Sequence, residues 1–143
     1  MEAKELMVGD WLQYYDCNLK KQCYAQVTSI QADGTEPYIQ TSDSDVYYLV
    51  ETYKPIPITS EILEKNRLNK CDDMKWCRVT HEVWEFGDNF YLYYDPYYNS
   101  FYIGTYIGDK NGSDFITDSI KIEYVHELQH ALRLCGIEKE IIL

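Results

Sequence analysis

The segment His126–His130 contains the residues of this chain whose types and spacing could perform catalysis. His126, Glu127 and His130 form the pattern H-E-x-x-H. On a helix this spacing places two imidazoles one turn apart, where they can bind zinc while the glutamate acts as general base on a zinc-bound water. The pattern therefore raises one specific possibility, a small zinc metallohydrolase with His126 and His130 as metal ligands and Glu127 as catalytic residue.

The helix that contains this pattern is expected to run from about Ser119 to Cys135 and to end at Gly136. Its apolar stripe is centred near Leu128. At about 100° per residue, both histidines point about 160° away from that stripe. We therefore expect them on a solvent-exposed helix face. That face would comprise His126, Gln129, His130 and Arg133.

A catalytic zinc site also needs a third protein ligand. Gly136 stands six residues beyond His130, where the extended metalloprotease motif has a third histidine. His81 is the only other histidine, and Glu138 and Glu140 follow the helix terminator. No recognisable carboxylate is available to orient the imidazoles. We therefore interpret the match as accidental, and we expect no metal, no cofactor and no catalytic residue.

The charge of the chain argues against nucleic-acid binding. Thirteen basic and twenty-four acidic residues give a net charge of −11, and such a surface repels phosphate. It is compatible with a basic protein partner, or with solubility alone. No apolar run approaches the roughly 18 residues of a membrane span, and residues 1–6 lack the apolar core of a signal peptide. We therefore expect a cytoplasmic protein that does not bind membranes.

The five cysteines are an odd number, and their spacings match no common zinc or redox pattern. We expect free thiols in a reducing compartment. A metal knuckle is the alternative. It would consist of Cys17, Cys23, Cys71 and Cys77.

The elements that must position all of these residues are mostly short strands. Fifteen tyrosines among 143 residues suit half-buried pleated surfaces and favour antiparallel sheet. Turn residues and alternation predict strands at residues 11–15, 23–30, 38–40 and 46–50. Pro55 and Pro57 confine the following segment, 54–58, to a sheet edge or an exit. This spacing predicts a small SH3-like barrel or a curled sheet over residues 1–58.

Residues 59–143 are expected to form a second part, or to complete one compact domain with the first. Thr59 or Ser60 can cap a short helix, Glu61–Lys65, and residues 66–73 read as a polar connector. A β-meander follows, before the C-terminal helix, and its strands are expected at residues 76–86, 90–94 and 101–107. The predicted fold class is α+β, mainly antiparallel.

Residues 90–107 contain seven of the tyrosines. Alternation places Phe90, Leu92 and Tyr94 on one face of their strand. The opposite face is expected to present Tyr91, Tyr93, Tyr102 and Tyr106. Tyrosine joins apolar area to a hydroxyl, so this set is a candidate interaction surface. Cross-strand pairing, or packing beneath the C-terminal helix, is the interpretation that we favour.

Four further segments resemble a known group of proteins. They are Glu5–Trp11, Gln26–Ile30, Ile56–Asn66 and Tyr124–Gln129. Together they resemble small uncharacterised proteins encoded by prophages and mobile elements of gut Bacteroidetes. In that group the last helix often reads Val-His-Gln-Leu-Gln-Asn, so Glu127 and His130 depart from it. The resemblance therefore implies no metal site here, and it brings no established activity.

These observations favour a non-enzymatic accessory or protein-interaction domain of a phage or mobile element. The absence of a supported catalytic site, the acidic surface and the resemblance motivate this hypothesis. Two alternatives remain open. One is the small zinc metallohydrolase described above, and the other is an acidic DNA mimic that inhibits a host DNA-binding protein.

Overall fold

The structure is a computed structural model of the chain. It describes residues 1–31, 36–66, 68–71, 74–76, 79–85, 90–108, 114–137 and 139–143. For parts of several strands it describes the backbone but not the side chains. By its contacts the chain divides into two compact units. The first comprises Met1–Pro57 and Tyr124–His126, and the second comprises Ile58–Glu123 and Glu127–Leu143.

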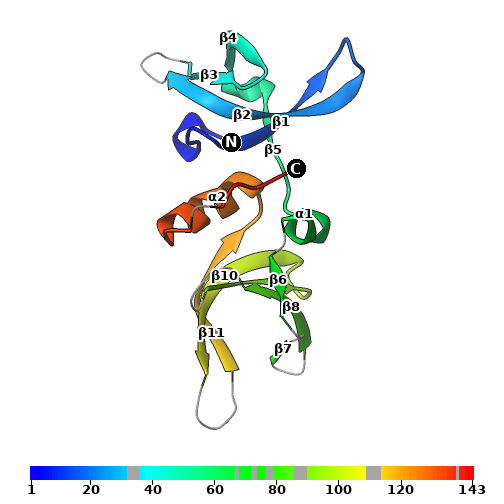
Figure 1. The fold of residues 1–143 in the computed structure, drawn as a ribbon, viewed down its shortest axis with the longest axis vertical. Helices are drawn as coiled ribbons and strands as arrows, with labels where there is room; N and C mark the ends of the chain where they lie inside the picture. The colour runs from blue at the N-terminus through cyan, green and yellow to red at the C-terminus, as the bar shows by residue number, and fades with distance from the viewer. Residues whose placement is uncertain are drawn as a thin grey trace. The chain divides into compact units, whose positions relative to one another are not determined.

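The first unit is built on a five-stranded antiparallel sheet of order β4-β3-β2-β1-β5 (Figure 1). Its elements are η1 (Ala3–Glu5), β1 (Trp11–Asp16), β2 (Lys21–Gln31), β3 (Tyr38–Thr41), β4 (Ser44–Leu49), η2 (Val50–Thr52) and β5 (Lys54–Pro55). The sheet does not close into a barrel. Of the two predicted forms, the curled sheet is therefore the one observed, and the proline-bearing segment takes the predicted edge position as β5.

Local chemistry explains the hairpin between β1 and β2. Asp16 Oδ1 accepts hydrogen bonds from the backbone N–H groups of Asn18 (2.8 Å) and Leu19 (3.0 Å), as in an Asx turn. The next residue, Lys20, adopts a left-handed φ of 52°.

Side chains from one face of the sheet form the core of the unit, together with Leu6, Val50 and Tyr53 from outside the strands. This core comprises Leu6, Leu12, Val27, Ile39, Val50 and Tyr53, with Tyr14 and Ile30 packed against it.

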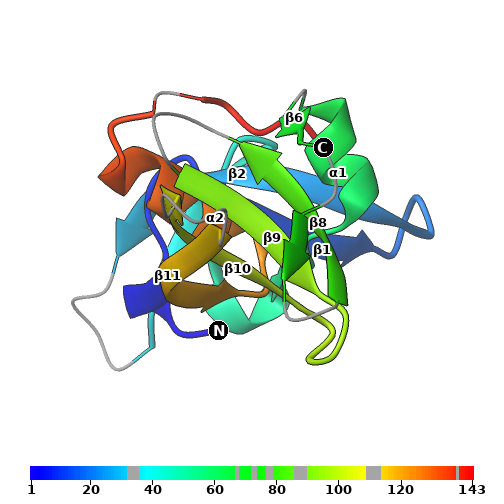
Figure 2. The same cartoon turned by 90° about the horizontal axis from the view of Figure 1, so that it is seen from below.

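The second unit is built on a six-stranded antiparallel sheet of order β11-β10-β9-β8-β6, in which β7 also pairs with β8. The sheet is strongly curled, and α1 and most of α2 lie on one side of it (Figures 1 and 2). Its elements are α1 (Ser60–Lys65), β6 (Asn69–Lys70), β7 (Met74–Trp76), β8 (Val79–Glu85), β9 (Phe90–Asp95), β10 (Ser100–Gly108), β11 (Asp114–Ile122) and α2 (Val125–Leu134).

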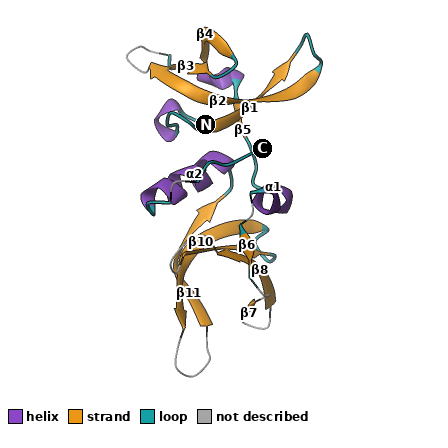
Figure 3. Ribbon diagram, viewed as in Figure 1, coloured by secondary structure: helices purple, strands orange, loops and turns teal. Residues whose placement is uncertain are grey.

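Strands dominate both units, while the helices are few and short (Figure 3). This composition confirms the predicted α+β class, mainly antiparallel. Helix α1 begins as predicted, because the Thr59 side chain accepts a hydrogen bond from the Ile62 N–H at 3.3 Å. Among the described helices, none is long and apolar enough to cross a membrane.

Three predicted boundaries are wrong. The C-terminal helix begins at Val125 rather than near Ser119, because residues 114–122 pair with β10 as strand β11. The polar connector after α1 contains strand β6, which pairs with β8. Trp76 ends β7 instead of starting the long strand of the meander. In each case pairing with a neighbouring strand overrides the local preference of the segment.

Candidate functional site

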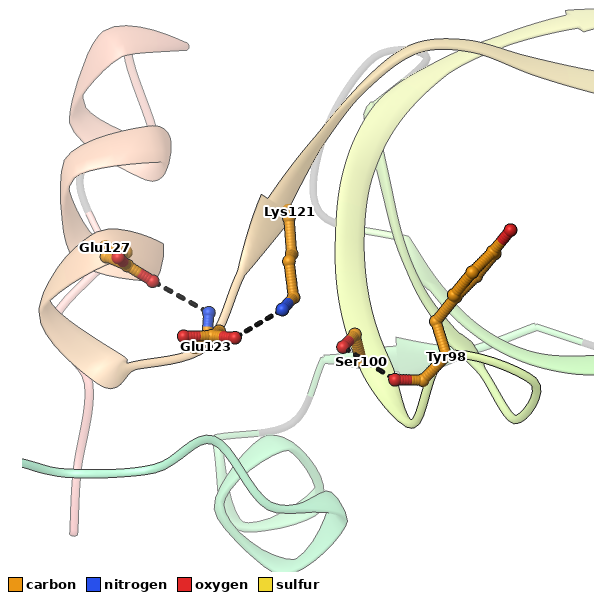
Figure 4. A network of polar contacts seen from close by, with 5 residues as sticks. All are labelled: Tyr98, Ser100, Lys121, Glu123 and Glu127. Carbon is orange, nitrogen blue, oxygen red and sulfur yellow. Dashed lines mark hydrogen bonds and ion pairs between the residues drawn. The ribbon is translucent and has the colours of Figure 1, made fainter.

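The histidine segment lies at the start of α2, as the pattern requires. Glu127 Oε2 accepts a hydrogen bond from the Glu123 N–H at 2.7 Å, and a Glu123 carboxylate oxygen pairs with Lys121 (Figure 4). Glu127 is therefore engaged in satisfying a backbone donor at the start of the helix, as an acidic residue in a first turn commonly is. This role needs no metal.

The expected exposure of this helix face is wrong. His126 is 3% exposed and Gln129 5% exposed, while His130 is half-buried and only Arg133 of the four is exposed. The ring of His126 stacks on that of Tyr124 at a centroid distance of 5.8 Å. The apolar stripe locates one buried side of a helix, but it does not reveal that a second side is also covered.

The described residues contain no group of three or more His, Cys, Asp or Glu side chains that could hold a metal ion. The side chain of His81 and residue 138 lie outside the described part. Four cysteines are free thiols, namely Cys17, Cys23, Cys71 and Cys135, while Cys77 is outside the described residues. Burial raises the pKa of the Cys135 thiol, which disfavours the reactive thiolate.

Among the tyrosines of residues 90–107, Tyr91, Tyr93 and Tyr102 are packed on the sheet, whereas Tyr97 and Tyr98 in the turn are exposed. Tyr93 is 4% exposed and stacks on Tyr102 of the next strand, with ring centroids 5.4 Å apart. Tyr91 and Tyr102 are half-buried against the same cluster, which also includes Val83. The side chain of Tyr106 lies outside the described part. Cross-strand packing therefore accounts for Tyr93 and Tyr102, and a binding role for this set stays a prediction.

The turn between β3 and β4 carries a polar network. Tyr14 donates a hydrogen bond to Asp43, and Thr41 Oγ1 donates to Asp43 Oδ1 at 2.7 Å and lies 3.0 Å from the Tyr53 hydroxyl. The bond to Asp43, together with burial, raises the pKa of Tyr14. Burial alone would raise the pKa of Asp43, but the hydrogen bonds from Tyr14 and Thr41 outweigh it and lower this pKa. Both shifts move away from neutral pH, opposite to what a general acid or base needs, so we assign the network a structural role.

The outward face of the first sheet has a composition that sequence reasoning missed. Strand alternation places it opposite the core side chains Leu12, Val27 and Ile39. It is charge-poor and rich in aromatic rings and amides. We call it the tyrosine–glutamine face, and it comprises Trp11, Gln13, Tyr15, Gln22, Tyr24, Gln26, Ser29, Gln31, Tyr38, Gln40 and Tyr47, with Asp45, Leu49 and Lys54 on its two edge strands.

Four tyrosines of this face are open to solvent. Tyr15 is 60% exposed, Tyr24 49%, Tyr47 42% and Tyr38 38%. Hydrogen bonds order several of the polar groups around them. Gln22 Nε2 donates to Gln13 Oε1 at 2.8 Å, Gln13 Nε2 donates to the Pro55 carbonyl at 2.7 Å, and the Tyr47 hydroxyl lies 3.0 Å from Ser29 Oγ. The face is therefore an exposed aromatic surface with partly ordered side chains.

The signal for this face is present in the sequence. In residues 11–15 and 22–26, aromatic residues and glutamines alternate with core residues such as Leu12 and Ala25. The pattern is period-two, so one set of positions must face away from the core. These tyrosines and glutamines are spread over several strands. The highest local density of tyrosine is in residues 90–107, and it directed attention there instead.

No protein family, curated protein or solved structure matches the chain.

Proposed function

We propose that this chain is a non-enzymatic accessory protein of a phage or mobile element, and that it acts by binding through the tyrosine–glutamine face. The observation that carries the proposal is the exposure of four tyrosines on a face nearly without charge. Surfaces that bind other molecules are commonly enriched in tyrosine and depleted of charge at their centre. The resemblance to proteins of prophages and mobile elements supplies the biological setting.

The rest of the chain supports binding more than catalysis. The Glu127 carboxylate accepts a hydrogen bond from the Glu123 N–H at the helix start. The pKa of Tyr14 is raised and that of Asp43 is lowered, so both are shifted away from neutral pH. A binding surface, in contrast, requires only accessible groups held in fixed positions. Exposed aromatic side chains on a sheet meet that requirement, because each ring has only two rotatable bonds to order on binding.

The first unit offers a matched pair of variants to test the proposal. Tyr47 and Tyr48 are neighbours on β4 with 42% and 40% exposure, but they point to opposite faces of the sheet. The whole chain is immobilised and exposed to host-cell extract, and the retained proteins and carbohydrates are quantified. We expect Tyr24→Ala with Tyr47→Ala to lower specific retention at least tenfold, and Tyr48→Ala to leave it unchanged. Equal retention by all variants, or reproducible turnover in an activity screen, would contradict the proposal.

A further inference from the structure

Cross-strand pairs on the tyrosine–glutamine face join aromatic rings to amides. Four pairs of directly opposed residues show this combination. They are Trp11–Gln26, Tyr24–Gln13, Tyr15–Gln22 and Tyr38–Gln31. Each pair sets an apolar ring beside a group with both hydrogen-bond donors and acceptors. A sugar ring presents the same combination, because it has an apolar C–H face and a rim of hydroxyl groups.

The ring of Tyr47 lies along the sheet rather than standing away from it. Tyr47 is on β4, and its hydroxyl lies 3.0 Å from Ser29 Oγ on β2. Strand β3 lies between these two strands, which are therefore about 9.6 Å apart. To reach across, the ring must pass over β3 near Gln40, which pairs with Ser29. A ring held in this way, 42% exposed, offers a flat surface on which a sugar can stack.

The electrostatics of the face select a neutral ligand. Apart from tyrosines, the ionisable side chains that the described strands place on this face are Asp45 and Lys54, which lie on the two edge strands and have opposite charges. A single-stranded nucleic acid would also stack on the rings, but it requires a basic groove along its backbone. Amide and hydroxyl groups bind hydroxyls without any charge, so such binding is insensitive to salt.

The layout of the face favours an extended chain over a folded protein. Its residues on β2 run from Gln22 to Gln31, about 30 Å along the strand, while four strand spacings of about 4.8 Å give about 19 Å across the sheet. The Tyr47 hydroxyl lies beside Ser29, five residues along β2 from Tyr24, so a ligand that touches both rings must run mainly along β2.

We propose that the tyrosine–glutamine face binds a neutral polysaccharide chain. This inference rests on the proposed function, because it names the ligand of the same face. The chain runs obliquely, mainly along β2, with sugar rings stacked on Tyr24 and Tyr47 and hydroxyl groups hydrogen-bonded to the glutamines between them. Tyr15 and Tyr38 extend the same platform toward the ends of the face.

Affinity electrophoresis of the whole chain tests this inference. Native gels contain a neutral polysaccharide (β-glucan, galactomannan or arabinoxylan) or, as an acidic control, alginate. We expect at least one neutral polysaccharide to retard the protein, with no change when salt is raised, and alginate to leave its mobility unchanged. Tyr24→Ala and Tyr47→Ala should each weaken binding at least tenfold, while Tyr48→Ala should change it less than twofold.

Thermal unfolding of each variant shows whether the sheet is intact. If Tyr47→Ala fails to fold, Tyr24→Ala and Tyr47→Phe replace it, and Tyr47→Phe should retain binding because the ring remains. The inference is overturned if no neutral polysaccharide retards the protein, or if Tyr48→Ala weakens binding as much as Tyr47→Ala. If a protein partner is retained and is lost with Tyr24→Ala and Tyr47→Ala, the inference fails and the proposed function stands. If nothing binds this face, both fail.

Discussion

Asn66 provides a quantitative test of how the second unit is held together. This residue is the C-cap of α1 and is 5% exposed. Its Nδ2 donates to the carbonyls of Ile62 and Ile142, both at 2.8 Å, and its Oδ1 accepts from the Ile142 N–H at 2.7 Å. One side chain therefore fixes the C-terminal segment to α1 with paired hydrogen bonds, and the neighbouring Ile141 is 1% exposed.

Replacing Asn66 by alanine removes all three side-chain hydrogen bonds. At about 1 kcal/mol for each bond, the loss is at most about 3 kcal/mol. Ile142 is 56% exposed, so water can replace part of what its backbone groups lose. We therefore expect Asn66→Ala to lower the free energy of unfolding by about 2 kcal/mol. For a chain of this size, that change corresponds to a fall in Tm of roughly 4–8 °C.

Thermal and urea unfolding measure this change, and hydrogen exchange localises it. We expect the Ile142 amide to lose protection in Asn66→Ala, because its acceptor is gone. The matched control is Asn18→Ala, in an exposed turn where the described bond is made by the backbone N–H of Asn18, with an expected change within about 0.5 kcal/mol. A loss below about 0.5 kcal/mol for Asn66→Ala would refute the assigned role of this side chain.

Three further predictions concern titration, the histidines and metal. Asp43→Asn should cost about 1 kcal/mol at pH 7, because the exposed part of this carboxylate discounts its hydrogen bonds. The pKa of Asp43 is lowered by Tyr14 and Thr41, so this contribution is present above the unfolded pKa of about 3.9 and is lost as pH falls through the lower folded value. The stabilities of wild type and variant should therefore converge once the pH is below the folded pKa. His126→Ala should lower the free energy of unfolding by about 1–3 kcal/mol, because His126 is buried against Tyr124. His130 is half-buried, so His130→Ala should lower it by less than half as much. Equal losses for the two variants would be evidence against the packing described for His126. Protein purified without added zinc should contain less than about 0.1 zinc per chain, and stoichiometric zinc lost in His126→Ala would support the hydrolase alternative instead.

The strands of the first unit and helix α1 could be predicted because their signals are local. Leu12, Ala25 and Val27 alternate with polar residues, and Thr59 is a capping residue that precedes an acidic first turn. The boundary of the last helix could not be predicted in this way. Residues 119–122 suit either a helix or a strand, and pairing with β10 decides between them.

The candidate sites show the same limit. The histidine pattern was visible in the sequence, but the burial of His126 and Gln129 could not be inferred from the apolar stripe of their helix. For the tyrosine–glutamine face, the local pattern was informative but the assembly of the strands was not predictable. Its alternation is local and readable, but only strand order brings Tyr47 of β4 over β3 toward Ser29 of β2. The residue types of the strands therefore indicate an exposed surface, and the order of the strands in the sheet decides which residues come together on it.

Site-specific photo-crosslinking tests the central claim most directly. The whole chain carries p-benzoylphenylalanine at position 47 or at position 48, which have nearly equal exposure on opposite faces of β4. In host-cell extract, we predict a discrete adduct from position 47 at a yield at least tenfold above that from position 48. Equal yields from the two positions, or an adduct from position 48 alone, would contradict binding through the tyrosine–glutamine face.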